Sequence, residues 1–201
     1  MSHEHYYTPN PTSEVVEKQM IFPIGGHSLS LVSVSGVFGF SHYVDKATQM
    51  LIHAFHPTGN EFLDLGCGFG AVGLSAKLLF PTVNITLSDI NTRAVDYARK
   101  NALLNNLAVN IVTSDLFAAL PNAKFTDILS NPPIAMGKPF LVRLIHESFE
   151  HLADGGAFWL VAFHNKGGST LKKIMAECFG NAEDVEKGGG IRVYKSIKTS
   201  R

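Results

Sequence analysis

The chain has little cysteine, no net charge and no long apolar run, and each absence excludes a class of protein. Cys67 and Cys178 are the only cysteines in 201 residues, which excludes a disulfide framework and a cysteine-based metal site. No apolar run has the length needed to cross a membrane, and the polar, aromatic N-terminus is unlike a signal peptide. We therefore expect a cytoplasmic protein with one folded domain.

Charge and histidine spacing narrow the possible partners further. The 17 basic and 17 acidic side chains give a formal net charge of zero, so no global attraction to nucleic acid is expected. The nine histidines include close pairs, such as His53 with His56, but no pair has a third ligand at a useful spacing, and we expect no metal ion. Residues 166–201 are locally basic, which indicates either a binding face or an ordinary solvated surface.

What is present is a regular alternation of strands and helices. Strands are expected at 61–65, 84–88, 109–113, 126–130 and 157–162, followed by a hairpin of 183–187 and 191–197. Helices are expected at 71–80, 92–105, 139–152 and 170–179, after an earlier helix that Asp45 caps. The alternation predicts an α/β, Rossmann-like fold, a mostly parallel seven-stranded sheet with an antiparallel edge strand. Residues 1–45 form a lead-in with a short hairpin, and 46–201 form the main domain.

Glycine-rich and polar segments follow four of the expected strands. The run Asp64-Leu-Gly-Cys-Gly-Phe-Gly70 follows the first, and Asp89, Asp115 and Asn131 follow the next three. In open α/β sheets, ligands bind beyond the carboxyl ends of the strands. The sequence therefore predicts one binding site that all four segments share.

The glycines of the first segment point to a cofactor. Gly66, Gly68 and Gly70 allow a tight strand-to-helix turn and a close approach of a ligand to the main chain. The pattern is ambiguous, because residues 68–73 also satisfy the G-x-G-x-x-G dinucleotide motif, with Asp89 about where a dehydrogenase places its ribose-binding acid. A nicotinamide-dependent oxidoreductase is therefore an alternative.

Three features favour S-adenosylmethionine over a dinucleotide. Asp64 suits a cofactor with a sulfonium and an ammonium group better than it suits a pyrophosphate. Asp115 can accept from an adenine amino group while Leu116 packs on the ring, although Asp115 could instead cap the next segment. The third feature is Asn131-Pro-Pro. Cys67 is interpreted as a small side chain under the cofactor. The predicted cofactor residues are Asp64, Gly66, Cys67, Gly68, Gly70, Asp89, Ile90, Ser114, Asp115, Leu116 and Asn131.

The segment after the fourth strand points to chemistry on an amine. An exocyclic amine is a poor nucleophile while its lone pair is conjugated into a ring. The Asn131 side-chain oxygen and the Pro132 carbonyl could accept its two hydrogens and turn the lone pair toward a methyl group. Two prolines fix φ and preorganise the acceptors, so catalysis would depend on orientation. The predicted catalytic residues are Asn131, Pro132, Pro133 and Ile134; in isolation the motif would indicate only a turn.

Together these motifs give a family resemblance over nearly the whole chain. It resembles the class I S-adenosylmethionine-dependent methyltransferases, and within them the C-type guanine-N2 methyltransferases of small-subunit ribosomal RNA, most closely their single-domain archaeal relatives. The resemblance implies methylation of a guanine N2 amine in ribosomal RNA. The matching segments are Ser35-Gly-Val-Phe38, Val44-Asp-Lys-Ala-Thr48, the Asp64 to Gly70 loop, Asp89-Ile-Asn91, Asn131-Pro-Pro-Ile134, Gly137-Lys138, Arg192-Val-Tyr-Lys195 and His5-Tyr-Tyr7.

Two departures from the bacterial members concern RNA. Those members usually have an aromatic residue after Asn-Pro-Pro, where this chain has Ile134, so stacking on the base would come from elsewhere, with Phe38 and Phe40 as candidates. They also carry a second, N-terminal domain without a counterpart here. RNA binding would then come from the lead-in hairpin, from the C-terminal basic residues or from a partner subunit, which could be a second copy of this chain. The candidate phosphate ligands, each equally interpretable as ordinary surface charge, are Lys138, Arg143, Lys166 and Arg192.

Two further alternatives stay open. The neutral net charge slightly favours a methyltransferase that acts on protein glutamine or on a small-molecule amine. Ile134 counts against the glutamine branch, whose members generally carry tyrosine there. A non-catalytic S-adenosylmethionine-binding subunit is the other alternative, and the intact Asn131-Pro-Pro segment argues against it.

Overall fold

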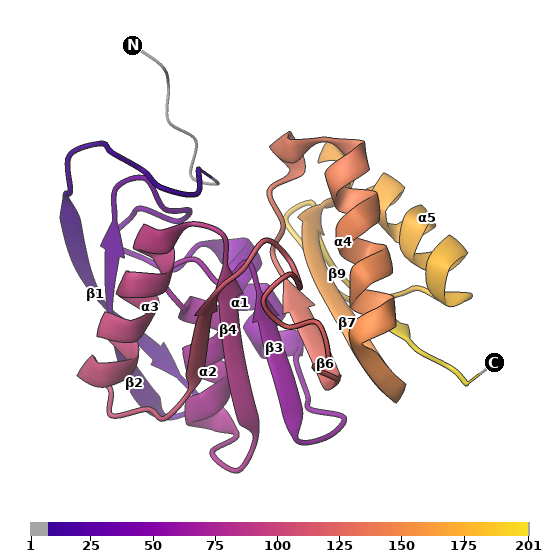
Figure 1. Ribbon diagram of the computed structural model, residues 1–201, viewed down its shortest axis with the longest axis horizontal. Coiled ribbons are helices and arrows are strands. Elements are labelled where there is room, and N and C mark those ends of the chain that lie inside the picture. Colours follow the sequence, from indigo (N-terminus) through magenta and orange to yellow (C-terminus); the bar gives the residue numbers. More distant parts are fainter. Residues whose placement is uncertain (1–7, 201) are drawn as a thin grey trace.

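The computed structural model describes residues 8–200 and contains one large twisted sheet, seen in Figure 1. Its strand order is β5-β4-β3-β6-β7-β9-β8. Neighbours from β5 to β7 are parallel, whereas β9 is antiparallel to both β7 and β8. The strands are β3 (Glu61–Leu65), β4 (Asn84–Asp89), β5 (Asn110–Thr113), β6 (Phe125–Ser130), β7 (Leu152–Phe163), β8 (Glu183–Gly188) and β9 (Ile191–Ile197).

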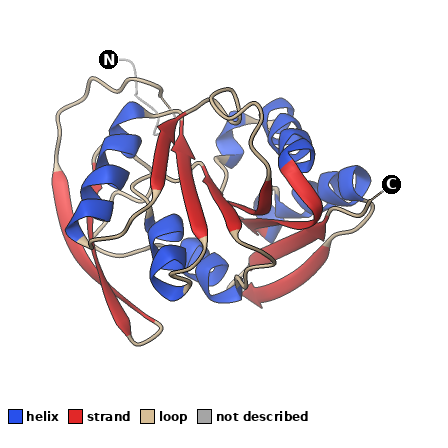
Figure 2. Cartoon of the chain, turned by 60° about the horizontal axis from the view of Figure 1, so that its bottom comes forward, coloured by secondary structure: helices blue, strands red, loops and turns tan. Residues whose placement is uncertain are grey.

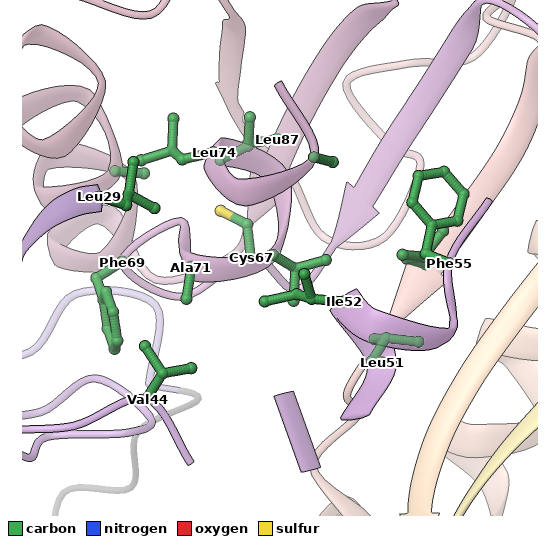
Figure 3. Packing of buried hydrophobic residues seen from close by; sticks show 14 of the residues in the cluster. Leu29, Val44, Leu51, Ile52, Phe55, Cys67, Phe69, Ala71, Leu74 and Leu87 are labelled. Atoms are coloured by element: carbon green, nitrogen blue, oxygen red, sulfur yellow. The ribbon is translucent and has the colours of Figure 1, made fainter. Parts of the chain in front are cut away.

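Helices cover both faces of the sheet, as Figure 2 shows. One hydrophobic cluster joins the sheet to α1, α2 and α3, and a second cluster joins it to α4 and α5. Figure 3 shows part of the first cluster, with Ile52 of α1 next to Cys67 of the glycine loop in this view. The helices are α1 (Lys46–Ala54), α2 (Ala71–Leu79), α3 (Thr92–Leu104), α4 (Lys138–His151) and α5 (Gly168–Phe179), with short 3-10 turns η1 (Ile134–Met136) and η2 (His164–Lys166).

The predicted α/β fold is confirmed, and each expected strand and helix is present. Several boundaries differ from the prediction by one or two residues, and one differs by more. The sequence predicts that the last parallel strand begins after the turn at 154–156, but β7 begins at Leu152, which pairs with Phe125. The turn residues join the sheet because Gly155 N donates to the Lys198 carbonyl and Lys198 N donates to the Gly156 carbonyl. The antiparallel strand β9 lies next to the edge, and β8 is the edge itself.

The lead-in forms a separate two-stranded sheet of β1 (Glu17–Ile24) and β2 (His27–Val34). Asn101 of α3 and Asn105, which caps the C-terminal end of α3, pair with the free edge of β2 as a neighbouring strand would. Asn105 Oδ1 accepts from Ser30 N, and Asn101 Oδ1 accepts from Val32 N, each at 2.8 Å, while their Nδ2 groups donate to the carbonyls of the same residues. Asn101 Nδ2 also donates to the Phe69 carbonyl, so α3 ties the hairpin to the glycine loop.

The hairpin shares its core with the main sheet. Met20, Phe22 and Leu29 are buried in the same cluster as Phe62 of β3 and Leu74 of α2. Across residues 8–200, no helix is long and apolar enough to cross a membrane. The segment His5-Tyr-Tyr7, which contributed to the family resemblance, lies outside the described residues.

Candidate active site

Two adjoining cavities lie over the carboxyl ends of β3, β4, β5 and β6. The sequence predicts a binding site at these strand ends. Both are lined by Gly66, Gly68, Phe38 and Asn131. The larger cavity is also lined by Val37, Leu65, Ser88, Asp89, Ile90, Ser114, Asp115, Leu116, Ser130, Pro133, Met136, Phe140 and Leu144. The smaller one is also lined by Asp45, Thr48, Asp64, Cys67, Phe69, Ala71 and Val72.

The glycine loop after β3 is fixed to the end of β4. Gly66 N and Cys67 N both donate to the Ser88 carbonyl at 2.9 Å, and Gly68 N donates to Asp89 Oδ2 at 2.8 Å. Gly66 and Gly68 have φ of +79° and +55°, a region that residues with a Cβ rarely adopt. A Cβ on Gly66 would meet no atom within 4 Å, so this part of the main chain is open to a ligand.

Two buried carboxyl groups stand beside this loop. Burial raises the pKa of Asp64 to about 7, although its Oδ2 accepts from Gly73 N at 2.8 Å, and the charge of Asp89 adds to the rise. Burial also raises the pKa of Asp89, against hydrogen bonds from Asn91 N and Gly68 N. A carboxylate has about four acceptor positions, so Asp89 retains a lone pair for another donor beside its backbone hydrogen bonds from Asn91, Gly68 and Ile90.

Cys67 fits the interpretation as a packing residue. Its side chain is 7% exposed, and burial raises the pKa of the thiol well above its usual value. The nearby carboxyl groups of Asp89 and Asp64 raise it further. A thiol is nucleophilic only as the thiolate, so this environment disfavours covalent catalysis by Cys67.

The segment after β5 shapes the wall of the larger cavity. Leu116 has φ of +47°, a conformation that costs a leucine backbone about 1–2 kcal/mol. The Ser114 hydroxyl donates to the Leu116 carbonyl at 2.8 Å and stabilises this turn. Asp115 lines the cavity, and its Oδ1 accepts from Arg143 Nη2 at 2.6 Å. Arg143 Nε also donates to Glu147, so two carboxylates already neutralise its guanidinium.

The Asn-Pro-Pro segment after β6 places Asn131 where the two cavities meet. Asn131 Nδ2 donates to Thr48 Oγ1, on α1, at 3.1 Å. Pro133 lines the larger cavity, whereas Pro132 is buried behind it. Ile134 lies against the turn before α5, since a Cβ on Gly167 would be 3.1 Å from Ile134 Cγ2.

Tertiary contacts bring Val37 and Phe38 into the site from about 30 residues before the glycine loop. Asn91 Nδ2 donates to the Gly36 carbonyl at 2.9 Å, and Arg93 Nη1 donates to the Ser35 carbonyl at 2.9 Å. Both donors lie at the N-terminal end of α3. They hold the Ser35-Gly-Val-Phe38 loop over the cavity, where Phe38 is 41% exposed.

Most predicted cofactor residues line one cavity or the other, but Gly70 does not. A Cβ on Gly70 would lie 3.1 Å from Leu74 Cδ1 and 3.2 Å from Leu87 Cδ2, so this glycine serves helix–strand packing. Four other predicted site residues also lie outside both linings: Pro132, Ile134, Lys138 and Arg143. Lys166 and Arg192, on η2 and β9, are outside as well.

Sequence reasoning missed residues that line the cavities. It assigns Asp45 and Thr48 only to a helix cap and a family motif, although their position at the start of an expected helix is a signal that could have found them. Ser88 precedes Asp89, and its buried hydroxyl has no hydrogen-bond partner among the described residues. Apolar lining residues such as Phe140 carry no sequence signal that distinguishes them from core residues.

The strand order, the antiparallel β9 and the site at the carboxyl ends define the class I S-adenosylmethionine-dependent methyltransferase fold. The family model of the methyltransferase small domain matches residues 28–195, and the chain belongs to this family. The predicted class is thereby confirmed. The chain is also similar to several known proteins over most of its length.

Among relatives, the uncharacterized protein YbxB of Bacillus subtilis (strain 168) is 34% identical over 97% of this chain and 98% of its own length. A second relative is the ribosomal RNA small subunit methyltransferase C of Hamiltonella defensa. It is 30% identical over 84% of this chain and 50% of its own length. The chain therefore spans about half the length of such C-type relatives.

Among solved structures, the 16S rRNA N2 methyltransferase RsmC of T. thermophilus, in complex with AdoMet and guanosine, has a TM-score of 0.80 at 22% identity. The match covers 94% of this chain and 52% of that chain. A methyltransferase from Pyrococcus furiosus has a TM-score of 0.69 at 25% identity, covering 79% of this chain and 85% of that one. Both matches support the same fold.

The residues present fit the cofactor of this class, S-adenosylmethionine. The open main chain at Gly66 can lie against a ligand, and Asp89 retains acceptor capacity at the end of β4. Ser88 also lines the larger cavity, and its buried hydroxyl has no hydrogen-bond partner among the described residues. Leu116 and Phe140 give that cavity apolar walls suited to an adenine ring.

Proposed function

We propose that this chain transfers a methyl group from S-adenosylmethionine to the N2 amine of a guanine in RNA, with ribosomal RNA as the substrate. The observation that carries the proposal is the place of Asn131, whose amide lies where the two cavities meet and is held by Thr48. The names of the C-type relative and of the T. thermophilus structure, which holds AdoMet and guanosine, support the choice of base.

The ends of β3, β4 and β5 would hold the cofactor, which supplies an electrophilic methyl group when bound. Asp89 would accept from the ribose hydroxyls with the lone pairs that its backbone hydrogen bonds leave. Asp115 would accept from the adenine amino group, and Leu116 would pack on the ring. Asp64, beside the smaller cavity, would face the cationic methionine end.

Asn131 and Pro132 would orient the target amine. The Asn131 oxygen and the Pro132 carbonyl are acceptors for its two hydrogens, so the lone pair is directed toward the methyl group. No strong base is required, because the proton can leave after the transfer. Ile134 lies against Gly167 rather than in a cavity. Phe38 and Met136, which are 41% and 37% exposed at the larger cavity, are therefore the candidates for contact with the base.

Two of the four candidate phosphate ligands suit RNA better than the others. Lys138 and Lys166 are exposed, follow the ends of β6 and β7 on the site side of the sheet, and form no ion pair with any described residue. Arg143 is paired with Asp115 and Glu147, and Arg192 Nε lies 3.8 Å from an Asp184 oxygen. We propose Lys138 and Lys166 as the principal contacts to phosphate.

The test is transfer of a labelled methyl group from S-adenosylmethionine into total RNA from a strain that lacks the gene, followed by nucleoside analysis. We expect label in N2-methylguanosine. Label in protein or in a small-molecule extract, with none in RNA, would replace the RNA substrate by another amine. Cofactor binding without transfer to any fraction would point to a non-catalytic subunit.

The family resemblance raises a homodimer as a separate proposal, which concerns the assembly of this chain and not its chemistry. Light scattering of the purified protein, with and without RNA, would give its mass. A monomer in both conditions would exclude the homodimer.

A further inference from the structure

Asn131 is linked to Thr48 in the first turn of α1, which comes 83 residues earlier in the chain. Asp45 is the N-cap residue of α1, and its Oδ1 accepts from Thr48 N at 3.0 Å. The other carboxylate oxygen, Oδ2, accepts from the Thr48 hydroxyl at 2.6 Å. Thr48 is only 5% exposed, and its hydroxyl oxygen in turn accepts from Asn131 Nδ2 at 3.1 Å. All three side chains line the smaller cavity.

This chain of hydrogen bonds has a fixed direction. A threonine hydroxyl carries one proton and two lone pairs. An ionised carboxylate can only accept, so the Thr48 proton goes to Asp45, and the length of 2.6 Å is typical of a charge-assisted O–H···O⁻ bond. Thr48 then has only lone pairs left for Asn131, and Asn131 must present its NH₂ group to Thr48.

The direction matters because an asparagine amide has two chemically opposite ends of nearly equal size. With Nδ2 held by Thr48, the group that Asn131 offers to the cavities is its oxygen, an acceptor. With the amide turned over, Asn131 would offer a donor, and a donor cannot bind the hydrogens of a substrate amine.

We infer that Asp45 and Thr48 are positioning residues that set the polarity of Asn131, so that its amide oxygen faces the substrate amine. The inference rests on the proposed role of Asn131 as an amine acceptor. It also explains why the segment before α1 and the Asn-Pro-Pro segment meet at one cavity. The cap of α1 thus orients the Asn131 amide in addition to stabilising the helix.

Three variants separate polarity from structure. Thr48→Val keeps the shape and removes the hydroxyl. Thr48→Ser keeps the hydroxyl. Asp45→Asn keeps a good helix cap, but its amide can donate to Thr48 and so frees the Thr48 proton for the Asn131 oxygen. Thr58→Val is the matched control, since the Thr58 hydroxyl donates to buried Asp127 at 3.0 Å at the opposite end of the sheet.

The first measurement does not depend on activity. Side-chain amide signals in ¹⁵N-edited NMR spectra, with Asn131 assigned from an Asn131→Ala variant, report the hydrogen exchange of its NH₂ group. We expect slow exchange in the wild type, Thr48→Ser and Thr58→Val, and fast exchange in Thr48→Val and Asp45→Asn. Slow exchange that persists in Thr48→Val would overturn the inference, even if the enzyme proved to have another substrate.

The second measurement separates turnover from cofactor binding. Thr48→Val and Asp45→Asn should lower kcat by about tenfold to 100-fold, with the cofactor Kd from calorimetry changed less than about twofold, while Thr48→Ser restores most of kcat. Equal losses in Thr48→Val and Thr48→Ser, or losses that follow the cofactor Kd, would contradict a polarity role. Absence of transfer by the wild type to every amine tested would instead overturn the proposed function.

Discussion

The two ends of the central strands both carry buried carboxyl groups, but their surroundings differ. Asp127, in the first half of β6, accepts from Thr58 N, Thr58 Oγ1 and Trp159 Nε1 at 2.8, 3.0 and 3.1 Å. Asp64, on the neighbouring strand β3, accepts one bond, from Gly73 N. The carboxyl group away from the cavities is surrounded by donors, whereas the one beside them is not.

The difference separates stability from function. A buried polar group that receives several hydrogen bonds costs little and fixes the structure around it. A buried carboxyl group with one donor has an unfavourable environment as an anion, and its pKa of about 7 reflects that. The carboxyl group at the site end of the sheet therefore has lone pairs left to accept hydrogen bonds from a ligand. The carboxyl group at the opposite end already accepts hydrogen bonds from other residues of the protein.

The largest expected effect is at the site end. Asn131→Ala removes the proposed acceptor of the target amine, and kcat should fall by about 100- to 1,000-fold. Cofactor affinity, measured by calorimetry, should change little, because Asp89 and the glycine loop are untouched. Equal losses of turnover and cofactor affinity would remove Asn131 from its proposed role.

At the opposite end, the effect should be on stability. Asp127→Ala leaves the buried Trp159 N–H and the Thr58 N–H without their acceptor, and the free energy of unfolding should fall by about 3 kcal/mol. Denaturant titration measures this loss. Asp127→Asn, which keeps one acceptor oxygen, should cost less. Turnover per folded molecule should stay near that of the wild type in both variants, and a selective loss of turnover would break the distinction between the two ends.

The raised pKa of Asp64 predicts an effect of intermediate size on cofactor binding. Between about pH 4 and pH 7 the folded carboxyl group keeps a proton that the unfolded one has lost, so its contribution makes unfolding easier as pH rises. A cationic cofactor favours the ionised form. Its affinity should therefore rise, by up to about tenfold, from pH 6 to pH 8.

Calorimetry over this pH range would measure the dependence, and Asp64→Asn, which can still accept from Gly73 N, should flatten it. The pKa of the neighbouring Asp89 is also raised, whereas the pKa of the Cys67 thiol lies well above this range. The isosteric variant is therefore the control that assigns the effect to Asp64. An unchanged pH dependence in Asp64→Asn would assign it elsewhere.

The smallest expected effects compare paired and unpaired surface cations. Arg143→Ala should change the free energy of unfolding by less than about 1 kcal/mol, because its ion pairs are about half exposed. It should leave the salt dependence of RNA binding nearly unchanged. Lys138→Ala should lower the slope of log K against log salt by about one. A lower slope in Arg143→Ala and an unchanged slope in Lys138→Ala would assign the phosphate contact to Arg143 instead of Lys138.

The positions of the glycine loop, Asp89 and the Asn-Pro-Pro segment could be predicted from the sequence. Each directly follows a strand that the local alternation of strands and helices predicts. The same reasoning gave Gly70 a place in the cofactor site, where the structure has it packing against Leu74 and Leu87. A glycine that serves a ligand and a glycine that serves helix packing look alike in a sequence. Only the neighbouring atoms distinguish them.

The sequence by itself determined the fold class, the edge of the sheet that holds the site and the residues directly after each strand. Tertiary structure alone decided that Arg93 holds the Phe38 loop over the cavity, that Arg143 neutralises Asp115, and that Thr48 holds the amide of Asn131. The physical reason is that periodicity and turn chemistry act between near neighbours. A hydrogen bond across dozens of residues leaves no pattern until the chain has folded.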